Sequence, residues 1–326
     1  MSGLRSGFDK AAAAWPPLRF VDVALRGLGQ VMFQNNALTG LFFLAAIVWG
    51  AVATGQPFVA ISGVLALVVA TAAAPLLSVD DADWRAGLYG FNGVLTGLAL
   101  ATFLAPGLLL VVFVVIGALL SVVATRATAR WLAPHGVPGL TFPFVAITML
   151  LLLASHGFAG VNATLLPTGA VTTPAVIVAS DPLRLSDFVG GVALSISQVF
   201  LKDSIIAALL FLAGLAVSSL PSALLAVAGA VIAVAVAHLF GAESDLVTGG
   251  LLGFSPVLTA VALGCVFATP TLRGLTYAAF ATLVTVIAQA ALNAALAPVA
   301  LPALTLPFVL VTWLFLLARP KAMAAT

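Results

Sequence analysis

Charged side chains divide the chain into long apolar runs. No Asp, Glu, Lys or Arg occurs in residues 27–79 or in residues 86–125. A membrane-spanning helix needs about 20 largely apolar residues, so each run is long enough for two. The Gly and Pro residues at 55–57 and 105–107 predict turns that divide the runs. The first part of the chain therefore predicts five spans, near residues 36–54, 58–77, 88–104, 107–125 and 141–158.

The second part of the chain repeats this plan. Its apolar runs predict five spans, near residues 204–219, 222–240, 247–266, 274–296 and 305–318. Each group of five follows a shorter apolar segment, Val21–Phe33 or Phe188–Leu201, which has few residues to cross a bilayer. We expect these segments to be re-entrant half-helices, which enter the membrane and stop. The predicted fold is an all-α polytopic membrane protein with ten transmembrane helices and two half-helices.

Sequence repeats support this division into two copies of one unit. The stretch GLYGFNGVLTGLAL at residues 87–100 recurs as GLLGFSPVLTAVAL at residues 250–263, displaced by 163 positions. PGLTFPF at 138–144 recurs as PALTLPF at 302–308, and the Gln-Val pair at 30–31 recurs at 198–199. Three matches in the same order indicate an internal duplication.

An odd number of spans in each copy predicts that the copies have opposite orientations in the membrane, as in transporters built from inverted repeats. With the N-terminus inside, the Lys and Arg residues fall on the cytoplasmic side except Arg184 and Lys202, with Arg26 on a half-helix uncounted. The predicted organisation is a cytosolic tail (1–20), a first repeat (21–158), a linker (159–186), a second repeat (187–318) and a cytosolic tail (319–326).

Composition agrees with the membrane assignment. Hydrophobic residues make up 63% of the 326 positions and charged residues 7%, against about 25% charged in soluble domains. The net charge of +2 comes with no basic cluster, so nucleic acid is not an expected partner. The single Cys265 excludes a disulfide within the chain.

The glycines of the first repeated stretch have a simple interpretation. Small residues let membrane helices approach closely, so Gly87, Gly90, Gly93 and Gly97 are expected to serve packing.

The repeated Thr-x-Pro-Phe element allows two interpretations. Pro143 and Pro307 predict helix starts that leave Thr141 and Thr305 as capping residues. In the first interpretation, each Thr only caps its helix, which is enough to explain a single Thr. In the second, the occurrence of Thr in both inverted copies predicts that the two residues face each other across the pseudo-two-fold axis.

Gln30 and Gln198 are uncharged side chains that are costly in lipid, so each should face protein or a water-filled cavity. One interpretation is that they satisfy loop backbone groups. Their matching positions on segments too short to span favour the other, that they line a pore.

The sequence lacks the residues that several transport mechanisms and enzyme activities require. No charge lies within a predicted span, so no proton relay or carboxylate sodium site can be named. His156 and His238 do not occupy matching repeat positions, so a conduction site built from a pair of histidines, as in ammonium channels, is not expected. The sequence contains no nucleotide-binding loop, metal-ligand cluster or nucleophile-base pairing, and no enzyme activity or cofactor is expected.

The duplicated elements together resemble the urea transporters of bacteria and vertebrates, over roughly residues 20–318. The resemblance implies ten spans, two half-helices and inverted repeats in a homotrimer of the cell membrane, with both termini cytoplasmic. It implies passive, selective conduction of urea through one pore in each subunit.

The resemblance also implies roles for particular residues. Gln30 and Gln198, each followed by a valine, Val31 or Val199, lie near the two mouths. Thr141 and Thr305 lie in the central constriction. The flanking walls are Phe33, Phe91, Leu95, Val199, Phe254 and Leu258. Relatives often carry Glu at position 198, and Leu201 stands where the first copy has Phe33.

The chemistry of urea fits such a site. Urea is planar and neutral, with four N–H donors and one carbonyl acceptor. Half-helix carbonyls with Gln and Thr oxygens supply a row of acceptors. Between Phe and Leu walls an ion loses its hydration water and gains no polar contact in exchange, so its desolvation energy excludes it from the pore. The alternative function is an ion-coupled secondary transporter for a small neutral amide or polyol.

Overall fold

A computed structural model describes residues 15–163, 165–167, 169–170 and 182–319, and all regular structure in these residues is helical. Most of the predicted tails, and residues 164, 168 and 171–181 of the predicted linker, lie outside the described residues. The helices of the N-terminal half are α2 (Pro16–Gln30), α3 (Ala37–Ala53), α4 (Pro57–Ala73), α5 (Asp81–Arg85), α6 (Phe91–Phe103), α7 (Leu108–Leu132) and α8 (Phe142–Gly157). Those of the C-terminal half are α9 (Leu185–Ser197), α10 (Ile205–Ser218), α11 (Leu220–Leu239), α12 (Ser244–Thr248), α13 (Phe254–Val261), α14 (Leu272–Leu296) and α15 (Leu306–Ala318).

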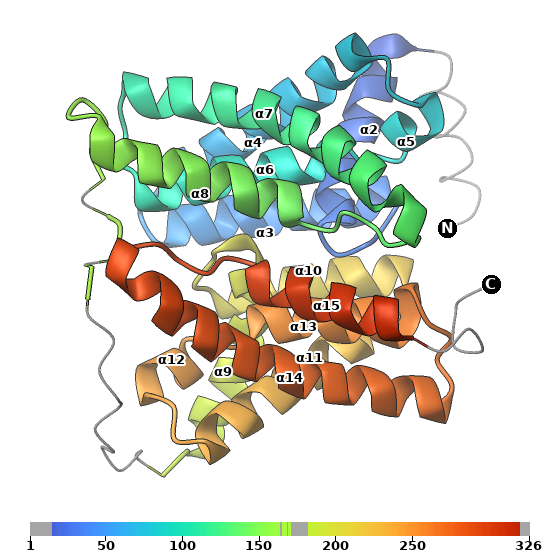
Figure 1. Cartoon of the computed structure of the whole chain (residues 1–326), viewed down its shortest axis with the longest axis vertical. Coiled ribbons are helices and arrows are strands. Elements are labelled where there is room, and N and C mark those ends of the chain that lie inside the picture. The colour runs from blue at the N-terminus through green and yellow to red at the C-terminus, as the bar shows by residue number, and fades with distance from the viewer. Residues whose placement is uncertain (1–14, 164, 168, 171–181, 320–326) are drawn as a thin grey trace.

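The two halves contain the same sequence of elements. Helix α3 begins at Ala37 and α10 at Ile205, while α6 begins at Phe91 and α13 at Phe254. In the view of Figure 1, the N-terminal half (blue to green) lies above the C-terminal half (yellow to red). Helices α3 and α10 pack against each other where the halves meet, and Thr39 Oγ1 donates to the carbonyl of Gly214 at 2.8 Å.

Helix length separates the predicted spans into two groups. In the described chain four helices are long and apolar enough to cross a membrane, counting the short continuations of α4, α7 and α14: Pro57–Leu77, Leu108–His135, Leu220–Leu239 and Leu272–Val299. The other apolar helices are shorter, such as α6 with 13 residues, which at 1.5 Å per residue is about 20 Å long. The second predicted half-helix ends in a bend, because Leu185–Phe200 and Ile205–Ser218 meet at 72°.

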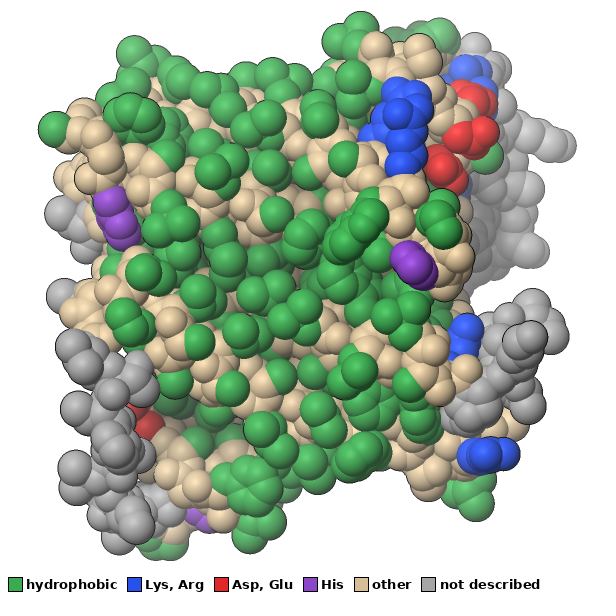
Figure 2. Space-filling model, viewed as in Figure 1, with side chains coloured by type: hydrophobic (Ala, Val, Ile, Leu, Met, Phe, Trp, Pro, Cys, Tyr) green, Lys and Arg blue, Asp and Glu red, His purple; other side chains and the backbone are tan. Residues whose placement is uncertain are grey.

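The surface agrees with a multi-pass membrane protein. Figure 2 shows a broad hydrophobic face, with the Lys and Arg side chains of this face gathered along its right-hand edge. Many exposed side chains on the long helices are large and apolar, including Leu108, Ile116 and Leu224. Exposed apolar surface of this extent is unfavourable in water, whereas contact with the hydrocarbon chains of lipid is favourable.

Glycine explains how the half-helices pack. Gly87 has φ +79°, and a Cβ atom there would lie 2.3 Å from the backbone nitrogen of Gly27 in α2. Gly250 has φ +68°, and its Cβ would lie 2.2 Å from the nitrogen of Ser195 in α9. Only glycine allows both the conformation and the close approach. The packing role predicted for Gly87 is therefore confirmed, and Gly250 has the same role in the second half.

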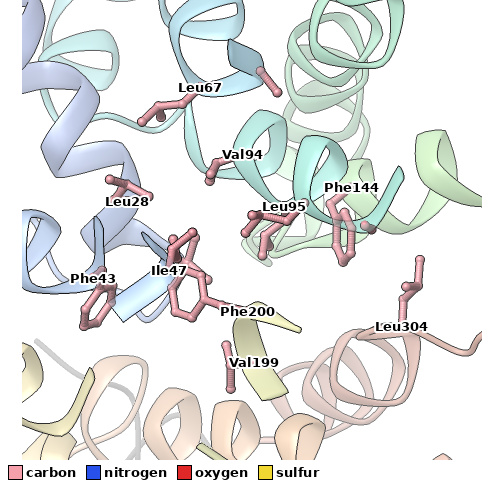
Figure 3. Packing of buried hydrophobic residues seen from close by; sticks show 14 of the residues in the cluster. Leu28, Phe43, Ile47, Leu67, Val94, Leu95, Phe144, Val199, Phe200 and Leu304 are labelled. Carbon is pink, nitrogen blue, oxygen red and sulfur yellow. The ribbon is translucent and has the colours of Figure 1, made fainter. Parts of the chain in front are cut away.

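Aromatic side chains fill the contact between the halves behind the half-helices. Phe200, directly after α9, stacks on Phe211 of α10 with ring centroids 4.4 Å apart. Phe43 of α3 contacts both rings, at 5.3 and 5.2 Å. Figure 3 shows Phe43 and Phe200 beside Ile47, with Val199 directed toward the C-terminal half. This cluster anchors the end of α9 against the N-terminal half.

Two local features were not part of the predicted organisation. Helix α2 begins at Pro16, within the residues assigned to the N-terminal tail. Proline is favoured in the first turn of a helix, and the Pro-Pro pair at 16–17 starts α2 early. Lys202, which the charge distribution assigns to the outer side, is 4% exposed, with its side-chain carbons against Gly50.

Candidate functional site

Two threonine hydroxyls meet between the halves of the molecule. Thr141 precedes α8 and Thr305 precedes α15, and their Oγ1 atoms lie 2.7 Å apart. The residues are 3% and 4% exposed. The predicted hydroxyl capping is wrong, because neither side chain bonds to its own helix. Each hydroxyl is engaged by the other, and the expectation that they face each other is confirmed.

The backbone before each threonine has the same unusual conformation. Leu140 has φ +51° and Leu304 has φ +49°. A leucine in the left-handed region is strained by its Cβ atom, at about 1–2 kcal/mol. The same strain in both halves indicates that it serves a shared purpose. The turn brings each Thr to the start of its helix with its side chain toward the other half.

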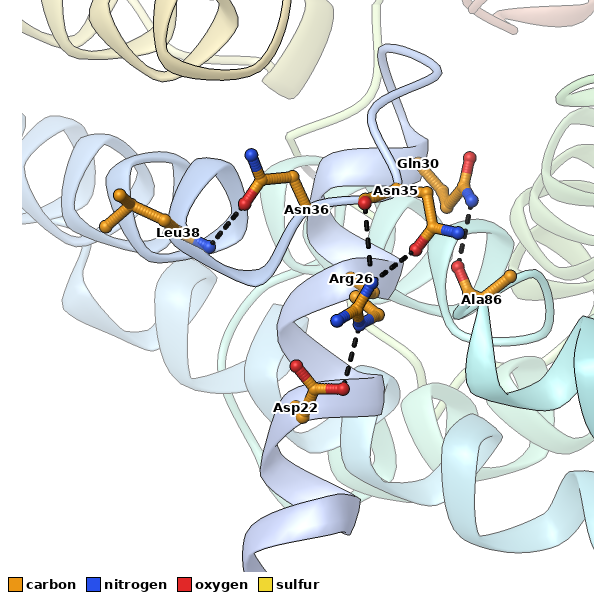
Figure 4. A network of polar contacts seen from close by, with 7 residues as sticks. All are labelled: Asp22, Arg26, Gln30, Asn35, Asn36, Leu38 and Ala86. Carbon is orange, nitrogen blue, oxygen red and sulfur yellow. Dashed lines mark hydrogen bonds and ion pairs between the residues drawn. The ribbon is translucent and has the colours of Figure 1, made fainter. Parts of the chain in front are cut away.

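The amide of Gln30 is fixed by a loop carbonyl. Gln30 ends α2, and its Nε2 donates to the carbonyl of Ala86 at 2.8 Å (Figure 4). A carbonyl only accepts, so the nitrogen must face Ala86 and the acceptor Oε1 is directed elsewhere. Gln198 follows α9, and its Nε2 lies 3.4 Å from the carbonyl of Gly249, 163 positions after Ala86. The structural interpretation therefore holds for the nitrogen atoms, and each Oε1 is left as an acceptor.

The predicted wall residues differ in exposure. Val31, Val199, Leu95 and Leu258 are all at most 2% exposed, and Phe91 and Phe254 are partly buried. Val31, Val199 and the two leucines therefore belong to the packed interior. Figure 3 shows Leu95 close to Phe144, the third residue of α8.

Phe33 makes aromatic contacts that connect the end of α2 with the C-terminal half. It has φ +64°, and its ring packs edge-on against Phe267 at 5.6 Å and Phe308 at 6.1 Å. Phe308 is the third residue of α15, close to Thr305. Leu201 occupies the matching place after α9 with φ +53° and brings no ring. The two half-helix ends therefore share a backbone turn and differ in side chain.

Phe267 and Phe308 were not predicted from the sequence. Phe308 belongs to the repeated PALTLPF element, which is a signal that could have found it. Phe267 follows a short π-helix, Ala262–Val266, that the first half does not contain at the matching place. A π-helix alters which side chains face a neighbour, so the pattern of the repeat does not place Phe267.

Charges lie close to the end of α2. Arg26 Nε lies 2.8 Å from Asp22 Oδ2, and Arg26 Nη1 donates to Asn35 Oδ1 at 2.9 Å (Figure 4). This network ties the chain after α2 back onto the helix. Within the described residues no group of three or more His, Cys, Asp or Glu side chains could hold a metal ion.

Comparison with known proteins identifies the family. A family model described as "UT: Urea transporter" matches residues 21–320. The chain belongs to the urea transporter family. Urea transporter 1 of Ovis aries is 29% identical over 330 residues, covering 98% of this chain and 83% of the relative. Urea transporter 1 of Mus musculus is 28% identical over 310 residues, covering 93% and 78%. Members of this family are transporters, which agrees with the expectation that this membrane protein has no enzyme activity.

Proposed function

We propose that this urea transporter is a passive, selective channel in which urea crosses between the two halves of each subunit. The observation that carries the proposal is the buried pair of hydroxyls of Thr141 and Thr305, one from each half. A hydroxyl both donates and accepts hydrogen bonds, so the pair can exchange its mutual bond for bonds to urea. These two residues form the central constriction.

The channel is built from two inverted repeats with ten spans and two half-helices. The matched order of helices and the matched left-handed residues, among them Leu140 and Leu304, support the repeat. The odd number of spans in each repeat supports the inversion. The half-helices α2 and α9 then enter from opposite sides, and their last carbonyls face the middle of the membrane.

The two mouths lie at Gln30 and Gln198. Each presents Oε1 as an acceptor, because Nε2 is directed to a loop carbonyl. Carbonyls at the ends of α2 and α9 continue the row of acceptors toward Thr141 and Thr305. Urea has four N–H donors, so it can move along this row by exchanging hydrogen bonds.

Apolar walls supply the selectivity. Phe33, Phe91 and Phe254 are partly exposed in the subunit, while Leu95, Leu258, Val31 and Val199 pack behind and between them. Flat walls accept a planar neutral solute and leave an ion without its hydration shell. Selectivity then follows from the desolvation energy of the ion.

The assembly is a homotrimer in the cell membrane with both termini in the cytoplasm. The distribution of Lys and Arg along the sequence supports this orientation. Each subunit carries its own pore, because the residues of the proposed constriction all come from one chain.

Urea flux into proteoliposomes without any ion gradient tests this function. A channel passes urea down the urea gradient alone, faster than protein-free liposomes do, and an imposed sodium or proton gradient leaves the rate unchanged. Flux that requires an ion gradient would instead indicate the coupled transporter of a small neutral amide or polyol.

A further inference from the structure

The buried side chain of Asn92 connects three helices. Asn92 lies in the first turn of α6 and is 0% exposed. Its Oδ1 accepts from the backbone N–H of Phe144 in α8 at 3.2 Å, and its Nδ2 donates to Thr125 Oγ1 of α7 at 3.1 Å. The Thr125 hydroxyl donates in turn to the carbonyl of Ser121 at 2.7 Å. These partners fix the amide orientation, since an N–H must face Oδ1 and an oxygen must face Nδ2.

The bond to Phe144 is one that Thr141 would ordinarily make. Thr141 is the N-cap of α8 and Phe144 is its third residue. A capping Thr normally adopts an extended conformation and accepts from the second or third N–H of its helix. Thr141 instead has φ −90° and ψ 14° and makes no such bond. Pro143, at the second position, has no N–H, so Phe144 carries the donor that needs an acceptor.

We propose that Asn92 is a positioning residue that caps α8 in place of Thr141 and thereby keeps the Thr141 hydroxyl available to the solute. The inference rests on the proposed function of Thr141 in the constriction. With the Phe144 N–H satisfied by Asn92, Thr141 has no need to turn back onto its own helix. Its hydroxyl stays directed at Thr305.

The second half lacks this arrangement. Ser255 takes the place of Asn92, and its hydroxyl donates to Gln289 Oε1 of α14 at 2.7 Å. Gln289 Nε2 donates to Asn293 Oδ1 at 3.0 Å, so this amide is engaged away from α15. Among the described residues no side chain accepts from the N–H of Phe308, the counterpart of Phe144. Of the two threonines in the proposed constriction, Thr305 is therefore the one whose own helix offers a competing donor, the N–H of Phe308.

A double-mutant cycle tests the assignment by urea flux per folded protein in proteoliposomes. Its members are the wild type, Asn92→Ala, Thr141→Val and the double variant. Without Asn92, the Phe144 N–H competes with the solute for the Thr141 hydroxyl, as the Phe308 N–H does for that of Thr305. Asn92→Ala should therefore slow urea, though no more than Thr141→Val does, and the double variant should be no slower than Thr141→Val alone.

Two further variants serve as controls. Asn92→Ser with Thr125→Gln transplants the second-half pair into the first half, which keeps an amide between α6 and α7 and leaves Phe144 without its cap. It should fold and be as slow as Asn92→Ala, and it replaces that variant in the cycle if Asn92→Ala does not fold. Ser255→Ala combined with Thr305→Val should show the product of the two single effects, because Ser255 does not cap α15.

The outcomes separate this inference from the proposed function. Wild-type protein that passes no urea would refute the channel itself. Wild-type conduction that Thr141→Val slows, combined with single effects of Asn92→Ala and Thr141→Val that multiply, would overturn only the role of Asn92. Wild-type flux through Asn92→Ala or the transplant would overturn it as well.

Discussion

Thr141 and Thr305 are 164 positions apart in the chain, yet their hydroxyl oxygens lie 2.7 Å apart. The pair is buried, and one of the two hydroxyls donates to the other. A net hydrogen bond contributes about 1 kcal/mol, so breaking this one for a solute that supplies its own bonds has a small net effect. Such an exchange suits a step that must bind and release quickly.

The first prediction concerns the mouth at Gln30. Gln30→Leu removes the acceptor Oε1 and also the 2.8 Å bond to Ala86. We expect weaker urea binding by roughly 0.5–1.5 kcal/mol, which is the net value of one hydrogen bond. The half-saturation concentration of urea flux measures this effect. Unchanged half-saturation in both Gln30→Leu and Gln198→Leu would assign the two glutamines to structural roles alone.

A second prediction distinguishes the two mouths. Gln198 Nε2 lies 3.4 Å from Gly249 O, a weaker bond than the 2.8 Å bond of Gln30. Gln198→Glu loses little and gains a charged acceptor, so urea should bind more tightly at that mouth. Gln30→Glu places a carboxylate against the Ala86 carbonyl and should lower the thermal unfolding midpoint more. Equal midpoints for the two Glu variants would contradict this difference.

The third prediction concerns the docking of α2. Gly87→Ala introduces left-handed strain and also a Cβ that meets the backbone of Arg26 and Gly27. Gly241→Ala is the matched control, because Gly241 has φ +71° with no atom within 4 Å of the added Cβ. Strain alone costs about 1–2 kcal/mol. Gly87→Ala should lose a further 1–3 kcal/mol, roughly, because backbone atoms cannot rotate away.

Unfolding of the two alanine variants in detergent checks this prediction. The midpoint of Gly87→Ala should lie clearly below that of Gly241→Ala. Similar midpoints would show that α2 moves away from the Gly87 turn at little cost in free energy.

A fourth prediction tests the orientation. In a Cys265→Ala background, Ala159→Cys lies after α8 and His135→Cys lies between α7 and α8, and both positions are exposed. An impermeant thiol reagent on intact cells should label the Ala159→Cys variant. The His135→Cys variant should react only after the membrane is permeabilised. The reverse pattern would refute cytoplasmic termini.

Much of the fold was predictable because charge and proline mark helix ends in a membrane protein. The span predicted at residues 36–54 is α3 (Ala37–Ala53), and that predicted at 305–318 is α15 (Leu306–Ala318). Duplication of the Thr-x-Pro-Phe element also predicted that Thr141 and Thr305 face each other. Each of these inferences depends on local sequence or on symmetry.

The details that break the symmetry were not predictable in the same way. The repeat differs at Asn92 and Ser255, but nothing in the sequence tells which helix an amide at that place will reach. Phe267 follows a π-helix whose extra residue shifts the register of the side chains after it. Hydroxyl capping by Thr141 is the expectation from local propensity, whereas in the structure the Phe144 N–H donates to Asn92 Oδ1.

The most direct test of the account is urea flux through the Thr141→Val/Thr305→Val protein. Valine keeps the β-branched shape and removes the hydroxyl, so packing is retained while the polar pair is lost. Losing one hydroxyl should cost about 1 kcal/mol at the central barrier, a several-fold drop in flux, and the double variant should lose more. Flux equal to that of the wild type, at equal amounts of folded protein in proteoliposomes, would contradict a conduction path through this hydroxyl pair.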